Sequence, residues 1–161
     1  MGKVVTQKMG ASKRSQEQDL NTLLKAATSF HGHFGPFLTL GVRMSLVGLR
    51  ELGAREGDMQ LLVTAILEYT LPFSCMLDGI QTVTKCTVGN KRLAWKESKE
   101  LGATFLLENS QRQVEVKVNS KVVRELSRKL DKKQSLDEEV RHLALDVASR
   151  SERELFSVIH K

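Results

Sequence analysis

Residues 36–52 read PFLTLGVRMSLVGLREL, a run in which apolar side chains occupy nearly every side of a helix. Pro36 suits the first turn of that helix, and Gly53 suits the position that ends it. A helix that is apolar all round is buried, so the rest of the fold must be built around it. Gly41 and Gly48 let another backbone approach closely, and part of this surface is expected to form a homodimer interface.

The other elements follow from apolar periodicity and capping signals. In chain order they are a helix over residues 17–28, a strand over 59–69, a helix over 74–84, strands over 103–108 and 114–118 joined by a hairpin loop, a helix from 119 or 120, a helix entered through a Ser135–Glu138 capping box, and a short helix from 151. Their irregular alternation predicts one α+β domain over 17–161, in which a small, mostly antiparallel sheet packs against helices. Residues 1–16 are polar and aperiodic and are expected to be a disordered tail.

Composition excludes several classes of protein. The 161 residues are 40% apolar and 27% charged, which is typical of one globular domain. No apolar run reaches the roughly 18 residues of a membrane helix, and the basic N-terminus lacks an apolar signal core. Two cysteines do not make a disulfide framework, so a cytoplasmic protein without a membrane partner is expected.

The net charge of +6 raises the possibility of nucleic-acid binding. The excess is divided between the N-terminal tail and residues 121–133, where the cations suit the solvated side of a helix. One Trp and one Tyr provide few rings on which bases can stack. Nucleic acid is therefore disfavoured as a partner, and a small-molecule ligand is favoured.

Four side chains carry most of the chemical potential. His31 and His33 flank a glycine between the first two predicted helices, and neutral imidazole is the commonest metal ligand, although a bare H-x-H pair is more often structural. Cys75 lies in the first turn of a predicted helix, where the helix dipole favours a thiolate, and Asp78 follows on the same side. A thiolate and a carboxylate beside imidazoles suit zinc, whereas the alternative for Cys75 is a buried small hydrophobe.

Cys86 lies eleven residues beyond Cys75. In a straight helix this separation corresponds to roughly 16 Å, too far for two ligands of one zinc ion. Either the helix ends early and the chain folds back, or only one cysteine lies at the metal, or a dimer brings Cys86 of one copy near Cys75 of the other. We favour Cys75 as the ligand.

Three segments, in this order and spacing, resemble the FmdE family of formylmethanofuran dehydrogenase-related proteins. Residues 30–36 are similar to the family's H-G-H-x-C-P-G segment, residues 75–81 to C-x-x-D-x-I-Q, and residues 86–90 to C-T-x-G-N. The resemblance spans residues 20–118 and implies an α+β core, often dimeric, with a metal-type site. The family is named for an operon association with molybdenum- or tungsten-dependent formylmethanofuran dehydrogenase, in the first step of methanogenesis from carbon dioxide.

Carried onto this chain, the resemblance implies a site for zinc or another divalent transition metal at His31, His33 and Cys75. It also implies Cys75 and Asp78 as candidate catalytic residues. The first interpretation is therefore an FmdE-like metal-binding protein of unknown reaction.

The chain departs from the family at two points. Gly35 stands where the family has a cysteine, so one soft ligand is missing, and no cysteine follows Cys86, so the C-terminal zinc finger of some members is absent. The second interpretation is a degenerate member that has kept a small-molecule pocket and acts as a non-catalytic binding or accessory protein.

Overall fold

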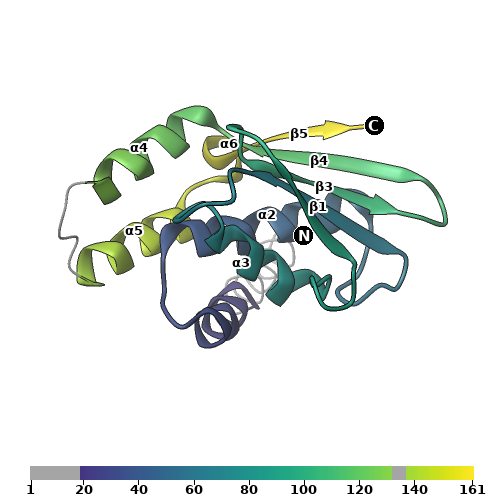
Figure 1. Ribbon diagram of the computed structural model, residues 1–161, viewed down its shortest axis with the longest axis horizontal. Coiled ribbons are helices and arrows are strands. Elements are labelled where there is room, and N and C mark those ends of the chain that lie inside the picture. Colours follow the sequence, from purple (N-terminus) through teal and green to yellow (C-terminus); the bar gives the residue numbers. More distant parts are fainter. Residues whose placement is uncertain (1–18, 132–136) are drawn as a thin grey trace, which may run out of the picture.

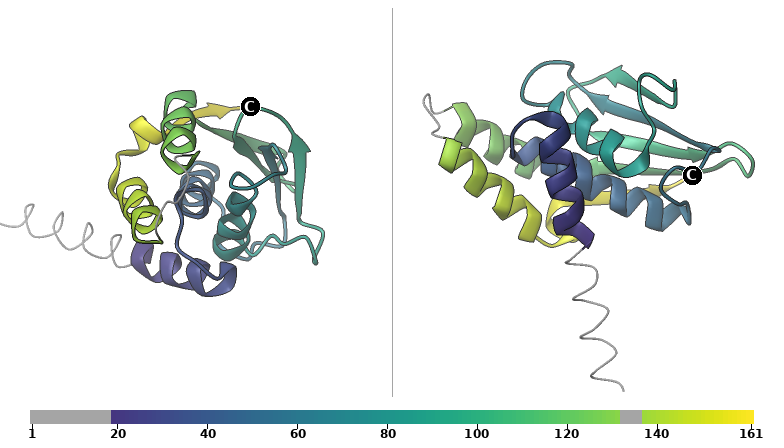
Figure 2. Two further views of the ribbon diagram at one scale, coloured as in Figure 1. Left: turned by 60° about the vertical axis from the view of Figure 1, so that its left-hand side comes forward. Right: turned by 90° about the horizontal axis from the view of Figure 1, so that it is seen from below.

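The computed structural model describes residues 19–131 and 137–161. A five-stranded sheet forms one layer, and the helices form a second layer on one side of it (Figures 1 and 2). The strands are β1 (Leu61–Leu67), β2 (Leu93–Glu97), β3 (Gly102–Leu107), β4 (Arg112–Val118) and β5 (Phe156–His160). Their order is β2-β1-β3-β4-β5, with β1 and β2 parallel and every other pair antiparallel. The predicted α+β class and mostly antiparallel sheet are confirmed.

The helical layer is built around α2 (Pro36–Leu52), which packs against β3, β4 and two other helices. A first helix covers residues 19–31, and the remaining helices are α3 (Cys75–Thr84), α4 (Ser120–Asp131), α5 (Asp137–Ser149) and α6 (Glu152–Leu155). Pro36 opens α2 and Gly53, at a φ of 69°, closes it, as predicted. Since the chain's own elements bury α2 on most sides, its apolarity needs no partner, and the homodimer stays a prediction.

Two glycines let α2 and α3 touch backbone to backbone. A Cβ atom on Gly41 would lie 2.3 Å from the Met76 carbonyl oxygen, and one on Gly79 would lie 2.4 Å from the Leu38 carbonyl oxygen. The expected close approach at Gly41 is therefore confirmed. Gly48 instead faces the ring of Phe105, so the expectation of a second backbone there is wrong. This tight crossing fixes the start of α3 beside the start of α2.

The largest differences from the predicted elements lie at helix and sheet margins. The first helix runs on to residue 31 rather than ending at 28, which places His31 in its last turn. The edge strands β2 and β5 were not predicted, because in each only the first residue is buried and the alternation that marks a strand is missing. The expected tail over 1–16 and Ser135 of the expected capping box lie outside the described residues.

Within residues 19–131 and 137–161, no helix combines the length and apolar character needed to cross a membrane.

Candidate functional site

A cavity of about 310 Å³ opens where α2 and α3 begin. The HGH loop contributes His33 and Gly35, and the start of α3 contributes Cys75. The end of α4 adds Asp131, and α5 adds Val140. Prolines and large apolar side chains complete the wall: Pro36, Phe37, Leu38, Leu71, Pro72 and Leu130. The cavity is therefore mostly apolar, with an imidazole, a thiol and a carboxylate as its polar groups.

Beside the cavity, His31 forms a close pair with Asp78. The His31 Nδ1 lies 2.6 Å from Asp78 Oδ2, and the rings of His31 and His33 are 4.6 Å apart between centroids. If Nδ1 carries the proton and donates it to the carboxylate, Nε2 keeps its lone pair. That Nε2 atom is buried and has no hydrogen-bond partner among the described residues. Such an imidazole is oriented to accept a proton or bind a cation.

Gln81 extends this pair to a distant loop. Its Nε2 donates to Asp78 Oδ1 at 3.1 Å, and its Oε1 accepts from the Val88 N–H at 3.1 Å. Asn90 closes the same loop by donating to the Lys85 carbonyl at 2.8 Å. The three sequence motifs are thus parts of one hydrogen-bonded unit. Sequence reasoning missed the bridging role of Gln81, and its place one helical turn beyond Asp78 is the signal that could have revealed it.

Cys75 does not have the lowered pKa that its helix position suggested. Its side chain is only 8% exposed, and burial, together with the nearby Asp78 carboxylate, raises the pKa of the thiol. The expected effect of the helix N-terminus is therefore outweighed by desolvation and a like charge. Without a ligand, Cys75 is held as a neutral thiol at neutral pH.

Cys86 has a different place in the fold. It is buried, it is not among the residues that line the cavity, and its Sγ lies 3.4 Å from the Leu61 carbonyl oxygen as a donor. Both cysteines are free thiols. The choice of Cys75 over Cys86 as the cavity cysteine therefore agrees with the structure.

The predicted metal ligands do not gather into a site made by protein donors alone. His33 and Cys75 line the same cavity, but His31 is engaged with Asp78. Among the residues that the structure describes, no three His, Cys, Asp or Glu side chains are grouped closely enough to hold an ion. Catalytic zinc sites take three protein ligands, so this donor set falls short of one. A Cβ atom on Gly35 would lie 3.4 Å from His33 Nε2, which is where a third donor is missing.

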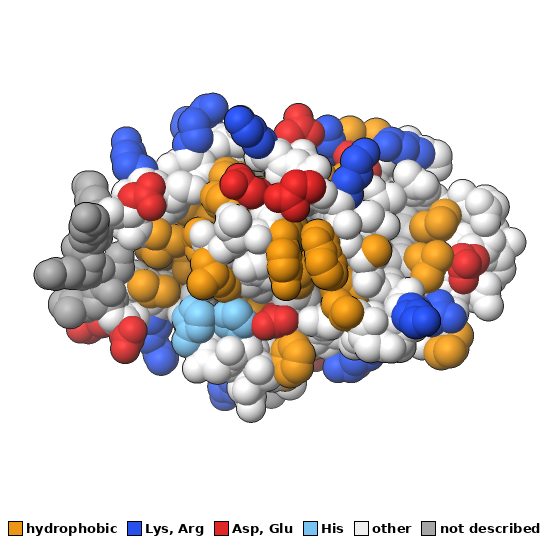
Figure 3. All heavy atoms as spheres, viewed as in Figure 1, with side chains coloured by type: hydrophobic (Ala, Val, Ile, Leu, Met, Phe, Trp, Pro, Cys, Tyr) orange, Lys and Arg blue, Asp and Glu red, His pale blue; other side chains and the backbone are white. Residues whose placement is uncertain are grey.

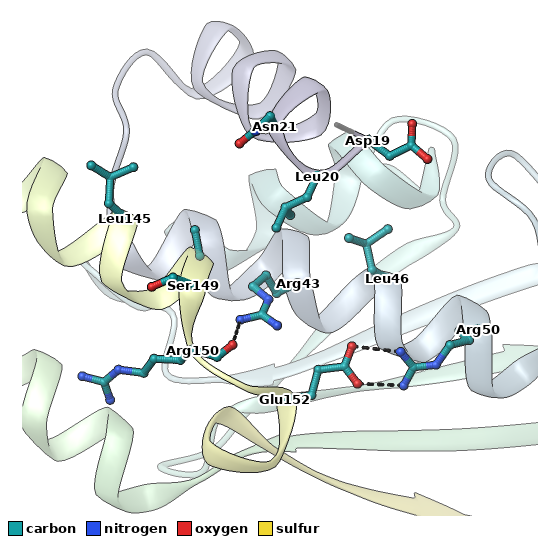
Figure 4. A pocket seen from close by; sticks show the side chains of 11 residues that line it. Asp19, Leu20, Asn21, Arg43, Leu46, Arg50, Leu145, Ser149, Arg150 and Glu152 are labelled. Atoms are coloured by element: carbon teal, nitrogen blue, oxygen red, sulfur yellow. Dashed lines mark hydrogen bonds and ion pairs between the residues drawn. The ribbon is translucent and has the colours of Figure 1, made fainter. Parts of the chain in front are cut away.

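A second, larger cavity of about 700 Å³ lies between α2, α5 and the first helix (Figure 4). Arg43 reaches into it and donates to the carbonyl oxygens of Val147, at 2.9 Å, and Arg150. Burial lowers the pKa of Arg43, which Glu152 partly offsets. Since these carbonyls end α5, Arg43 serves as a helix cap that ties α5 to α2.

The fold and cavity define a small α+β domain with a ligand-sized, mostly apolar cavity beside a His–Asp pair. Residues 30–157 match the family described as "FmdE, Molybdenum formylmethanofuran dehydrogenase operon", and the chain belongs to the FmdE family.

Two similar proteins place the chain further. A crystal structure of an FmdE-like protein of tungsten formylmethanofuran dehydrogenase type from Syntrophus aciditrophicus superposes with a TM-score of 0.57, at 21% identity, over 88% of this chain and 71% of that one. This likeness confirms the fold. A probable S-adenosyl-L-methionine-binding protein of Archaeoglobus fulgidus is 36% identical over 108 residues, or 67% of this chain. The chain spans only 30% of the length of that relative.

Proposed function

We propose that this chain is a small-molecule-binding FmdE domain whose ligand occupies the cavity at the start of α2 and α3. The observation that carries the proposal is the cavity itself, which places His33, Cys75 and Asp131 in an otherwise apolar wall. Ligand sites in proteins are typically concave, apolar and of roughly 300–1,000 Å³, with a few polar groups that orient the ligand. The expected ligand is an organic molecule with an apolar body and one polar end.

The chemistry of the polar end supports a neutral binding role. The Cys75 thiol, whose pKa is raised, donates a weak hydrogen bond, and the His33 imidazole donates or accepts one. His31 is oriented by Asp78 beside this end of the cavity, so proton transfer to a bound ligand is available to the site. The proposal assigns no reaction to these groups.

A fragment titration followed by NMR tests this proposal. The library should include S-adenosyl-L-methionine, because the Archaeoglobus relative is named as a probable binder of that compound. We expect amide shifts that cluster on the cavity and disappear in Val140→Phe, which narrows it. The matched control is Leu145→Phe, a substitution on the same helix that borders the second cavity. If no compound perturbs the cavity, or Val140→Phe binds as the wild type does, the proposal fails.

A second candidate is a metal-binding site for zinc or another divalent transition metal at His31, His33 and Cys75. The observation that favours it is the buried Nε2 of His31, which has no hydrogen-bond partner among the described residues. Bound metal would neutralise the cost of leaving that atom unpaired, and a small ligand would have to supply the remaining donors. Elemental analysis of untagged protein decides: near-stoichiometric metal that is lost in both His33→Ala and Cys75→Ser would favour this candidate.

A further inference from the structure

Tyr69 and Trp95 form a stacked pair of rings on the surface. Their centroids are 4.7 Å apart and their planes differ by 20°. Tyr69 is 55% exposed and Trp95 39% exposed, so much of each ring still faces solvent. Large exposed aromatic groups in contact with one another are typical of binding surfaces.

The register of the sheet explains why these rings are exposed. In the parallel pair β1–β2, Trp95 lies opposite Ala65 and Glu97 lies opposite Leu67. Ala65 and Leu67 are buried under the helices, and side chains that alternate along a strand keep to one side. Trp95 and Glu97 therefore point to the helical side, but from an edge strand where they stay exposed. The Tyr69 N–H donates to Glu97 Oε1 at 3.2 Å, which joins the two strand ends.

Carboxylates without a cation surround the pair. Glu68 and Glu97 are exposed, and neither takes part in any ion pair formed by the described residues. Figure 3 shows acidic and hydrophobic side chains side by side on this face, close to histidines. We call Glu68, Tyr69, Trp95 and Glu97 the aromatic shelf. Its carboxylates are left uncompensated in a chain with a net charge of +6.

We propose that the aromatic shelf binds the onium group of a small organic ligand, a quaternary ammonium or a sulfonium. Aromatic faces attract cations that shed water readily, and indole is the strongest of them. A carboxylate beside the ring adds attraction for the same charge. Hard metal ions prefer several oxygen ligands and suit the shelf less well.

A second copy of the chain fits the shelf poorly. In a two-fold dimer the same patch contacts itself, so Glu68 and Glu97 would face the carboxylates of the other copy. Like charges across an interface disfavour association. A cationic ligand has the opposite, matching charge.

The shelf is separate from the cavity, although Leu71, two residues beyond Tyr69, lines the cavity wall. The inference does not rest on the proposed function, because an onium ion such as tetramethylammonium is small enough to bind at the shelf alone. Failure of cavity binding and failure of shelf binding are thus observed in different experiments.

The test uses the intrinsic fluorescence of Trp95, the single tryptophan of the chain. Tetramethylammonium chloride is titrated against sodium chloride at matched ionic strength. We expect a saturable change with the onium salt alone, with affinity reduced about threefold in Glu97→Gln and about threefold in Tyr69→Leu. Glutamine keeps an oxygen that accepts the Tyr69 N–H, so the first variant changes charge alone. Glu108→Gln, an exposed carboxylate in the β3–β4 hairpin, should bind as the wild type does.

Three results would overturn the inference. The first is no fluorescence change, or one that sodium chloride reproduces. The second is equal affinity in the wild type and Glu97→Gln. The third is a Trp95 signal that changes on dilution of the protein without the probe, which would mean that another copy of the chain covers the shelf.

Discussion

Replacing Gly35 with cysteine should create a zinc site in this chain. Gly35 has an extended backbone, with φ of −129° and ψ of 164°, which any residue adopts without strain. A Cβ atom there would lie 3.4 Å from His33 Nε2 and 3.8 Å from Val140 Cγ1, so the new side chain fits with a small adjustment. Since Gly35 and Cys75 line the same cavity, the thiol would join His33 and Cys75 as a third donor. Three protein ligands are the usual number for an open zinc site.

The size of the effect follows from linkage between binding and folding. At a free zinc concentration about 100 times the dissociation constant, binding to the folded state alone adds about 2.7 kcal/mol of stability. For a domain of this size that increment raises the melting temperature by roughly 5–10 °C. The wild type, with its incomplete donor set, should shift far less.

The assay is a thermal melt of Gly35→Cys with and without zinc, under reducing conditions, combined with elemental analysis. Ser110→Cys is the control, because it adds an exposed thiol in the β3–β4 turn, away from the cavity. Gly35→Cys combined with Cys75→Ser should lose the effect. If Gly35→Cys gains no more from zinc than Ser110→Cys does, the missing thiol is not what keeps this cavity from binding metal.

Three further substitutions test the packing and electrostatics. Gly79→Ala should lower the free energy of unfolding by about 1–3 kcal/mol in urea melts, because its Cβ would meet the α2 backbone at 2.4 Å. Hydrogen bonds from Arg150 help to lower the pKa of Glu125 from 4.5 to about 2, so this carboxylate stabilises the fold above pH 4.5 and loses that effect as the pH falls towards 2. Glu125→Gln should therefore cost about 1 kcal/mol at pH 7, the scale of a partly exposed pair, and nothing near pH 2. Asp78→Asn removes a charge that raises the pKa of Cys75, so iodoacetamide should alkylate Cys75 faster at pH 7.5.

Each of these has a matched comparison. Gly89→Ala places its Cβ no closer than 3.8 Å to another residue, so it should stay within about 0.5 kcal/mol of the wild type. An equal loss in both alanine variants would contradict the close α2–α3 crossing. Glu108→Gln serves for Glu125→Gln, and parallel pH profiles of the two variants would show that the ion pair with Arg150 adds no stability. For alkylation, Cys86 is only 1% exposed and should remain unlabelled, and an unchanged rate at Cys75 would refute the influence of Asp78.

Much of the fold was predictable because its signals are local. The limits of α2 follow from Pro36 and Gly53, and the start of α3 from a proline and a serine near Cys75. The short helix α6 is capped by Ser151, whose side chain accepts from the Glu154 N–H, as predicted. In contrast, β2 and β5 depend on pairing with strands that are distant in sequence, and their own residues lack the alternating pattern.

The sequence by itself determined the α+β class, the buried α2 helix and the family, because periodicity, capping residues and ordered motifs are written in neighbouring positions. Only the tertiary structure decided which side chains meet. His31 and Asp78 are 47 residues apart, yet they form one hydrogen-bonded pair, while Cys75 and His33 share a cavity without a third donor among the described residues. The raised pKa of Cys75 has the same origin, since burial and a neighbouring charge are properties of the folded surroundings and outweigh the local effect of the helix end.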